Sequence, residues 1–284
     1  MPSTPDTIVM IHGLWMTSRS WEHWAQRYRD SGYNVIADSW PGMDADVEAL
    51  RSNPTPIAEQ TIARIVDHYD GIIRGLDHPP IIMGHSFGGA FTQVLLDRGL
   101  GASGVAIASA AVKGVTRLPF STLRTGWPIL RNPLNRRRAV AITLEQFHYR
   151  FTNHLTVAAS EPIYDRYCVP GAGHVLFEGA AANFNPKAAT KVDFRNDRRA
   201  PLLFIAGGID HVSPPSINRS NVKRYRKSSA VTDYKEYDGR SHLTLGQDGW
   251  EVVADHALAW AASHGATESH GATEPDRPVD SPIP

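Results

Sequence analysis

The chain has a single cysteine, Cys168, among 284 residues. One cysteine excludes an internal disulfide framework and a cysteine-based metal site, and no catalytic motif surrounds it, so we expect a buried thiol. The chain also lacks an apolar run of about 18 residues, which a membrane-spanning helix would need. Its first residues lack the basic and apolar regions of a signal peptide. These absences predict a soluble, cytoplasmic protein.

An excess of charge of either sign is missing too, because 29 lysines and arginines balance 29 aspartates and glutamates. Bulk attraction to nucleic acid or to an anionic membrane is therefore not expected. We expect a small-molecule substrate as the partner, with no nucleic acid, no membrane, no cofactor and no metal. The sequence leaves the oligomeric state open.

Short apolar runs closed by Gly or Pro alternate along the chain with helical patterns. The longest helical pattern spans 62–76, where apolar residues recur at steps of three and four; shorter ones begin at Trp21 and Trp250. This alternation predicts an α/β fold with a doubly wound, mostly parallel sheet of about six strands. The expected strands are 8–11, 35–37, 80–83, 105–108, 202–205 and 231–237.

Residues 112–198 break the alternation. They carry several prolines, the basic run Arg136-Arg137-Arg138 and an aromatic segment from Phe147 onward. An insertion of this length is too long for a plain crossover, so we expect a helical cap over the cleft, with the arginines on a solvated face. The core then comprises 1–111 and 199–262, and the repetitive, proline-rich segment 263–284 is expected to be disordered.

One motif carries chemistry: Gly84-His85-Ser86-Phe87-Gly88-Gly89 stands directly after the expected strand 80–83 and before a helical pattern. A serine with Gly two positions away on each side fits the strained strand-to-helix turn called a nucleophile elbow. Short matches of this kind also occur in ordinary turns, but the strand and helix around this one favour Ser86 as the nucleophile. His85 and Phe87 are expected to be packing groups, and Phe87 also borders the acyl pocket.

A serine hydroxyl needs an imidazole to take its proton, and the imidazole needs a carboxylate to orient it. His242 follows the last expected strand, and Asp210 follows the strand 202–205, so both emerge at the same edge of the sheet. The other common place for the acid, residues 109–112, offers no carboxylate. We therefore predict Ser86, Asp210 and His242 as the catalytic residues, with a helix N-cap as the alternative role of Asp210.

Two backbone amides complete the predicted site. The amide of Phe87 opens the helix after the elbow, and Gly13 allows a sharp turn that presents the amide of Leu14, so both are candidates for the oxyanion hole. Read alone, His12-Gly13 would be a simple strand-end turn. The candidate lining of the substrate pocket is Trp15, Phe147, Phe151, Tyr164 and Phe177.

The chain order Ser86, Asp210, His242 resembles that of the α/β-hydrolase superfamily over about residues 6–262. His12-Gly13, 38–42 and Gly207-Gly208-Ile209-Asp210 match its pattern as well. Because seven residues precede Ile8, the resemblance implies a sheet lacking the family's first two strands, as in plant-type methylesterases and hydroxynitrile lyases.

The resemblance implies a capped serine hydrolase that cleaves an ester or lactone of a small to medium apolar substrate through an acyl-serine. Leu14, where the lyases tend to have Thr, favours hydrolysis over lyase chemistry. Ser86, where dehalogenases and epoxide hydrolases have Asp, disfavours those activities. The open alternatives are carbon–carbon bond cleavage, lyase or perhydrolase chemistry with the same residues, and a slow-turnover ligand-binding receptor.

Overall fold

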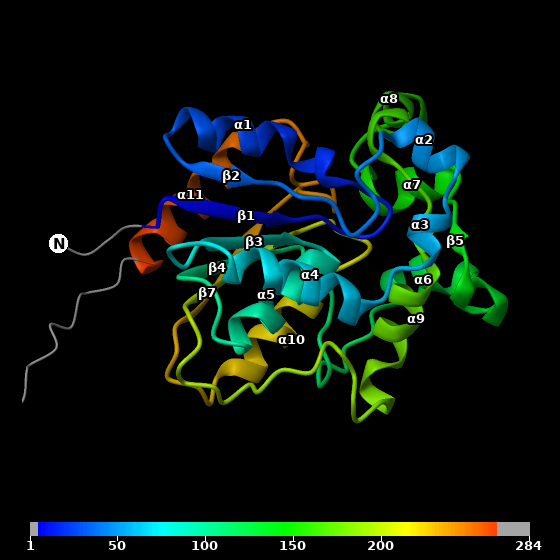
Figure 1. Ribbon diagram of the computed structural model, residues 1–284. Helices are drawn as coiled ribbons and strands as arrows, with labels where there is room; N and C mark the ends of the chain where they lie inside the picture. Colours follow the sequence, from blue (N-terminus) through cyan, green and yellow to red (C-terminus); the bar gives the residue numbers. More distant parts are fainter. Residues whose placement is uncertain (1–4, 266–284) are drawn as a thin grey trace, which may run out of the picture.

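The computed structural model describes residues 5–265 and contains a six-stranded sheet covered by helices on both faces (Figure 1). Every neighbouring pair of strands is parallel, which confirms the expected α/β class and sheet. The strands are β1 (Thr7–Ile11), β2 (Asn34–Ile36), β3 (Ile81–His85), β4 (Ser103–Ile107), β7 (Leu202–Gly207) and β8 (Thr232–Tyr237).

The central strands are apolar because both of their faces are buried. In β1, Ile8 and Met10 pack on one side, while Val9 and Ile11 pack on the other. The first side is covered by α1 (Glu22–Asp30), which follows the short helix η1 (Ser18–Trp21), and by α11 (Trp250–Gly265). The second side is covered by α4 (Ile62–Arg74), α5 (Phe87–Asp97) and α10 (Pro215–Tyr225).

The strand order β2-β1-β3-β4-β7-β8 places β1 beside β3, although β2 lies between them in the chain. Ile11 at the end of β1 is therefore level with Gly84 near the end of β3. The direction of winding reverses between these two strands, and ligands of doubly wound sheets bind at the carboxyl ends beside such a reversal. The loop after β1 and the elbow after β3 are thus neighbours.

The segment 112–198 folds mainly into helices, which lie beyond the carboxyl ends of the strands (Figure 1). Two of its elements, the short strands β5 (Ala139–Val140) and β6 (Gly171–Ala172), pair as an antiparallel ribbon. Its elements are α6 (Phe120–Leu130), η2 (Pro133–Arg137), β5 (Ala139–Val140), α7 (Leu144–Phe151), α8 (Val157–Tyr167), β6 (Gly171–Ala172), α9 (Gly173–Ala181) and η3 (Ala182–Phe184).

Two short helices from the segment between β2 and α4 pack against the helices of 112–198. Helix α2 (Val47–Ser52) contacts α8, and α3 (Thr55–Ala58) contacts the β5–β6 ribbon. They belong to the range 1–111 expected to form the core. The layer over the sheet edge is therefore built from two separate segments.

Near the C-terminus, α11 extends through Gly265. Residues 263–265, expected to begin the disordered segment, are therefore helical. The rest of that segment, 266–284, lies outside the described residues. Between residues 5 and 265, no helix is both long and apolar enough to cross a membrane.

Gly88 sits where the first turn of α5 meets the loop after β1. A Cβ atom at this position would lie 2.1 Å from the carbonyl oxygen of Ile11 and 2.9 Å from that of His12. We therefore expect Gly88→Ala to lower the free energy of unfolding by about 3 kcal/mol or to prevent folding, because backbone must move. Urea denaturation measures the effect.

Gly71 in α4 provides the matched control. A Cβ atom added there meets nothing within 4 Å, so Gly71→Ala should raise the free energy of unfolding by about 0.5–1 kcal/mol through helix propensity. Similar stabilities for the two variants would contradict the close approach of Gly88 to the β1 loop.

Candidate active site

Ser86 lies between β3 and α5 with φ 57° and ψ −117°, a conformation that costs energy for a residue with a side chain. Neighbouring backbone holds it there: its amide donates to the carbonyl of Ile107 at 2.9 Å, and its carbonyl accepts from Gly89 and Ala110. Gly84 permits the turn because a Cβ on it would lie 2.1 Å from the carbonyl oxygen of Gly88. The strand, strained serine and helix have the geometry of a nucleophile elbow.

The loop after β1 comes as close to Ser86 as a glycine allows. A Cβ atom at Gly13 would lie 2.8 Å from Cβ of Ser86. Among residues 5–265, the amide of Leu14 donates no hydrogen bond to another backbone group, and Phe87 is the first residue of α5 and has no partner within the helix. Two backbone donors beside the serine are thus left free for a ligand.

His12 fixes this loop. Its Nδ1–H donates to the carbonyl of Gly13 at 3.0 Å, its Nε2 accepts from the amide of Trp40 at 3.1 Å, and its ring stacks on the Trp40 ring at 4.7 Å. Burial lowers the pKa of His12 to about 4. The imidazole is therefore neutral near pH 7 and positions the loop beside Ser86.

The lowered pKa of His12 predicts a loss of stability in acid. Between pH ~6.5 and ~4, an unfolded chain binds a proton at this residue that the folded chain does not bind. The free energy of unfolding should therefore fall across this window as the pH is lowered, by up to about 3 kcal/mol from His12 alone.

Urea unfolding at pH values near the two ends of the window, for the wild type and His12→Gln, tests this. The variant should be less stable near neutral pH and should depend less steeply on pH, while His85, whose pKa burial also lowers, is retained in both proteins. An unchanged slope would show that His12 is not the group that resists protonation.

Asp210 and His242 form a buried pair. Oδ2 of Asp210 lies 2.7 Å from Nδ1 of His242, and both side chains are fully buried. Oδ1 of Asp210 accepts from the amides of Val212 and Ser213 at 2.7 and 2.9 Å. The carboxylate thus accepts three hydrogen bonds, and the one from Nδ1–H fixes the tautomer in which Nε2 of His242 carries a lone pair.

Nε2 of His242 is buried and has no hydrogen-bond partner within the described part of the chain. The structure pairs Asp210 with His242, whereas a hydrogen bond from Ser86 to His242 is not formed among residues 5–265. Ser86 itself is only 5 % exposed. The elbow and the pair therefore meet at one edge of the sheet, in a closed site.

His85, the last residue of β3, contacts His242 directly. Its Nε2–H donates to the carbonyl of His242 at 2.8 Å, and the two rings lie 4.7 Å apart. Burial and the neighbouring His242 lower the pKa of His85 well below its usual value, so its ring is neutral. The expectation that His85 is a packing group agrees with these contacts.

Helix α7 is tied to both loops that carry the pair. The carbonyl of Phe151 accepts from Oγ of Ser241 at 2.8 Å and from the amide of Leu243 at 3.1 Å. The carbonyl of Tyr149 accepts from the His211 ring at 2.9 Å. The segment 112–198 is thus fastened directly to the residues that flank Asp210 and His242.

A row of aromatic rings leads away from His242. Phe151 lies 5.2 Å from the His242 ring, Phe147 lies 4.9 Å from Phe151, and Tyr164 lies 5.5 Å from Phe147. Trp15 contacts the same row, 6.4 Å from Phe151. Four of the five candidate pocket residues therefore form one cluster with the histidine.

The fifth candidate, Phe177, and the elbow residue Phe87 both lie at α9. Phe177 lies half-buried on that helix and stacks on no aromatic ring among residues 5–265. The Phe87 ring reaches α9 at Gly179, where a Cβ atom would lie 2.9 Å from it. Phe87 thus packs between the elbow and the inserted segment, while the structure does not link Phe177 to the row at His242.

The sequence did not predict that an arginine is buried beside this aromatic cluster. Arg150 is buried, and its guanidinium donates to the carbonyls of Thr125 at 2.6 Å and Gln146 at 2.9 Å. Burial lowers its pKa to about 10, so it stays cationic near pH 7. In the sequence, nothing distinguishes Arg150 from the arginines of 136–138, which are exposed as expected.

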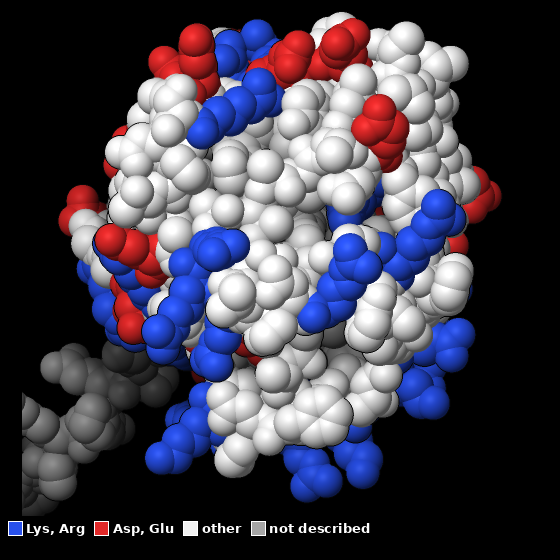
Figure 2. All heavy atoms as spheres, turned by 90° about the vertical axis from the view of Figure 1, so that its right-hand side faces the viewer, with Lys and Arg blue, Asp and Glu red and all other residues white. Residues whose placement is uncertain are grey.

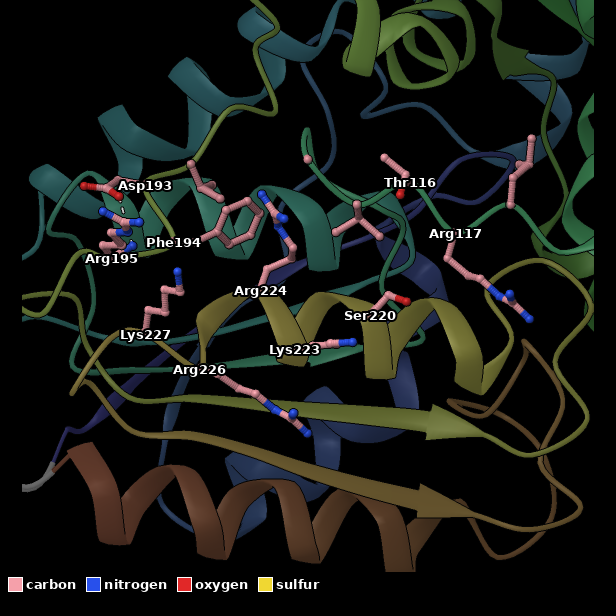
Figure 3. A pocket seen from close by; sticks show the side chains of 14 residues that line it. Thr116, Arg117, Asp193, Phe194, Arg195, Ser220, Lys223, Arg224, Arg226 and Lys227 are labelled. Carbon is pink, nitrogen blue, oxygen red and sulfur yellow. Dashed lines mark hydrogen bonds between the residues drawn. The ribbon is translucent and has the colours of Figure 1, made fainter.

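Within residues 5–265, neither a metal site nor a reactive cysteine accompanies these residues. The part of the chain that the structure describes holds no group of three or more side chains suited to a metal. Cys168 is buried as expected, and burial raises the pKa of its thiol to about 12. A cavity of about 1080 Å³ lies along α10 rather than at Ser86 (Figure 3).

Comparisons with known proteins agree with the fold. The model of the "Alpha/beta hydrolase family" matches residues 8–256. No curated protein matches the chain in sequence.

Several solved structures share the fold at low sequence identity. The monoacylglycerol lipase of Paleococcus ferrophilus is 18 % identical, covering 92 % of this chain and 96 % of its own, with a TM-score of 0.61. A pyrethroid hydrolase from Sphingobium faniae JZ-2 is 17 % identical over 91 % and 98 %, with a TM-score of 0.64. A thermophilic esterase from Thermogutta terrifontis is 18 % identical over 94 % and 92 %, with a TM-score of 0.64.

Proposed function

Because the chain belongs to the alpha/beta hydrolase family, we propose that it is a serine hydrolase that cleaves an ester or lactone of a small to medium apolar substrate. One observation carries the proposal: Ser86 stands on a strained turn at the sheet edge where the buried pair Asp210–His242 also lies. The names of the similar structures, a lipase, a pyrethroid hydrolase and an esterase, support ester hydrolysis in general.

In the proposed mechanism, Oγ of Ser86 attacks the substrate carbonyl carbon while Nε2 of His242 takes the hydroxyl proton. Asp210 keeps Nδ1–H of His242 oriented and stabilises the imidazolium. The amides of Leu14 and Phe87 donate to the oxyanion of the tetrahedral intermediate. The C–O bond to the leaving alcohol then breaks as the alkoxide oxygen receives the proton from His242.

The acyl-serine is hydrolysed by the same groups in reverse. His242 takes a proton from water, whose oxygen attacks the acyl carbon, and returns the proton to Oγ of Ser86 as the acid leaves. The free Nε2 of His242 supports this role because it has no other hydrogen bond to give up. Bonds between nucleophile and base are often long before substrate binds.

We assign the cap role to residues 112–198 together with α2 and α3. The row Phe151, Phe147 and Tyr164, with Trp15, supplies an apolar lining that starts at His242 and suits an apolar acyl or alcohol group. Phe87 and Phe177 extend this proposed lining toward α9.

A fluorophosphonate probe tests the proposal because it phosphonylates an activated serine. We expect one adduct, located on Ser86 by peptide mass spectrometry, and loss of hydrolysis of esters and lactones of graded size in proportion to labelling. Turnover that continues in fully labelled protein would overturn the assignment of Ser86. Labelling without turnover of any ester or lactone would contradict the hydrolase and favour another use of the same residues.

A further inference from the structure

Helix α6 turns an apolar stripe toward solvent. Phe120 is 78 % exposed and Trp127 is 59 % exposed, and Leu123 between them is exposed as well. The spacing of three and then four residues places all three on one side of the helix. The opposite side, with Thr125, Gly126 and Ile129, is the buried one. Apolar side chains clustered in this way mark an interaction surface rather than ordinary exposure.

Arginines share the same stripe. Arg124 and Arg131 are exposed and stand four residues after Phe120 and Trp127, respectively. Helix η2, which packs against α6, adds an exposed Leu134 and the exposed run 136–138. We call this set the arginine–aromatic face: Leu118, Phe120, Leu123, Arg124, Trp127, Arg131, Leu134 and Arg136–Arg138.

The sequence has no Asp or Glu between Asp97 and Glu145, and among residues 5–265 the arginines of this face form no ion pair. In the view onto the side of the molecule where α6 lies, Lys and Arg side chains spread over the middle and lower parts, and most acidic ones gather at the upper and left-hand rims (Figure 2). The balance of charge over the whole chain therefore hides a strongly one-sided distribution.

The large cavity along α10 extends this positive region. Arg117 lies at one end of it, and Arg195 and Lys227 lie at the other (Figure 3). Leu118 of the arginine–aromatic face also lines it. Its one acidic lining residue, Asp193, accepts a hydrogen bond from the backbone of Arg195. The additional cations of the lining are Lys223, Arg224 and Arg226.

We propose that the arginine–aromatic face binds the surface of an anionic lipid bilayer. Phe120, Leu123 and Trp127 enter the interfacial region, and the surrounding arginines contact lipid phosphates. A bilayer surface offers apolar depth and negative charge in one plane, which is the combination that this face presents. The proposal goes beyond ester hydrolysis and departs from the expectation drawn from the overall charge, because binding depends on the local distribution.

A second copy of the chain is a poorer occupant of the face. Two copies related by a twofold axis would bring the same patch of each together, so the arginines of one would meet those of the other with no carboxylate between them. A purely acidic ligand would satisfy the arginines but leave Phe120 and Trp127 in water.

Co-sedimentation with vesicles tests the proposal. We expect the full chain to bind vesicles of equal parts phosphatidylcholine and phosphatidylglycerol at least about tenfold more tightly than pure phosphatidylcholine, and high salt to reduce this preference. Phe120→Ser/Trp127→Ser should weaken binding by about tenfold or more. Val252→Ser is the matched control, since Val252 is 64 % exposed on α11 and does not belong to the arginine–aromatic face.

Fluorescence locates the contact. Anionic vesicles should shift the emission to shorter wavelength, and Trp127→Phe should abolish the shift while keeping the binding. Ser86→Ala should bind vesicles like the wild type, so failure of the proposed hydrolysis would not affect this test. Equal, weak binding to both vesicle types would overturn the proposal, as would a dimer in gel filtration that Phe120→Ser/Trp127→Ser dissociates.

Discussion

Ser86→Ala is expected to lower kcat for ester hydrolysis by about four orders of magnitude or more, without loss of folded protein. The substitution removes the Oγ that would form the acyl-enzyme, and the hydrogen bonds holding the turn at Ser86 come from backbone atoms that alanine retains. Steady-state kinetics on the best ester of a graded panel, with circular dichroism for folding, measure the effect.

Ser18→Ala is the control for this variant. Ser18 follows the same β1 loop, and within residues 5–265 its hydroxyl bonds only to Ser39, at 2.9 Å, so its removal should leave kcat within about a factor of two or three. If Ser86→Ala retained activity comparable to that of Ser18→Ala, the nucleophile would have to be another group.

Asp210→Asn is expected to reduce kcat by about four orders of magnitude as well, through the tautomer of His242. Oδ1 of Asp210 accepts from two backbone amides, so the oxygen of an asparagine must take that place and its NH₂ group must face Nδ1 of His242. Nδ1 then becomes the acceptor and Nε2 carries the proton. An imidazole in this form cannot take the proton of Ser86.

Asp38→Asn provides a matched control, because Asp38 also pairs with a histidine near the sheet edge. Its Oδ2 lies 2.8 Å from Nε2 of His68, but both side chains are partly exposed. Its loss should change kcat little. Comparable losses in the two aspartate variants would mean that Asp210 acts on the general stability of the edge and not on His242.

The strands were predictable because parallel strands buried on both faces leave unbroken apolar runs. All six expected runs form strands of the one sheet, and even the polar run at 231–237 does so as β8 at its edge. The place of Asp210 and His242 followed from the same logic, since loops after neighbouring parallel strands emerge together.

Helices α2 and α3 were not predictable. They are six and four residues long, too short to show a helical period. Contacts with the segment 112–198 stabilise them. The burial of Arg150 depends in the same way on a distant contact, because its guanidinium donates to the carbonyl of Thr125 in α6, which lies 25 residues earlier in the sequence.

The sequence by itself determined the sheet, the elbow at Ser86 and the chain order of the proposed catalytic residues. These depend on local patterns: apolar runs, and glycines where another backbone approaches within a few ångströms. Tertiary structure alone decided which aromatic rings reach His242, which arginine is buried, and which face of α6 stays exposed. Such choices depend on contacts between residues far apart in the chain, as between Phe151 and Ser241 or Trp15 and Val140, and local periodicity carries no information about them.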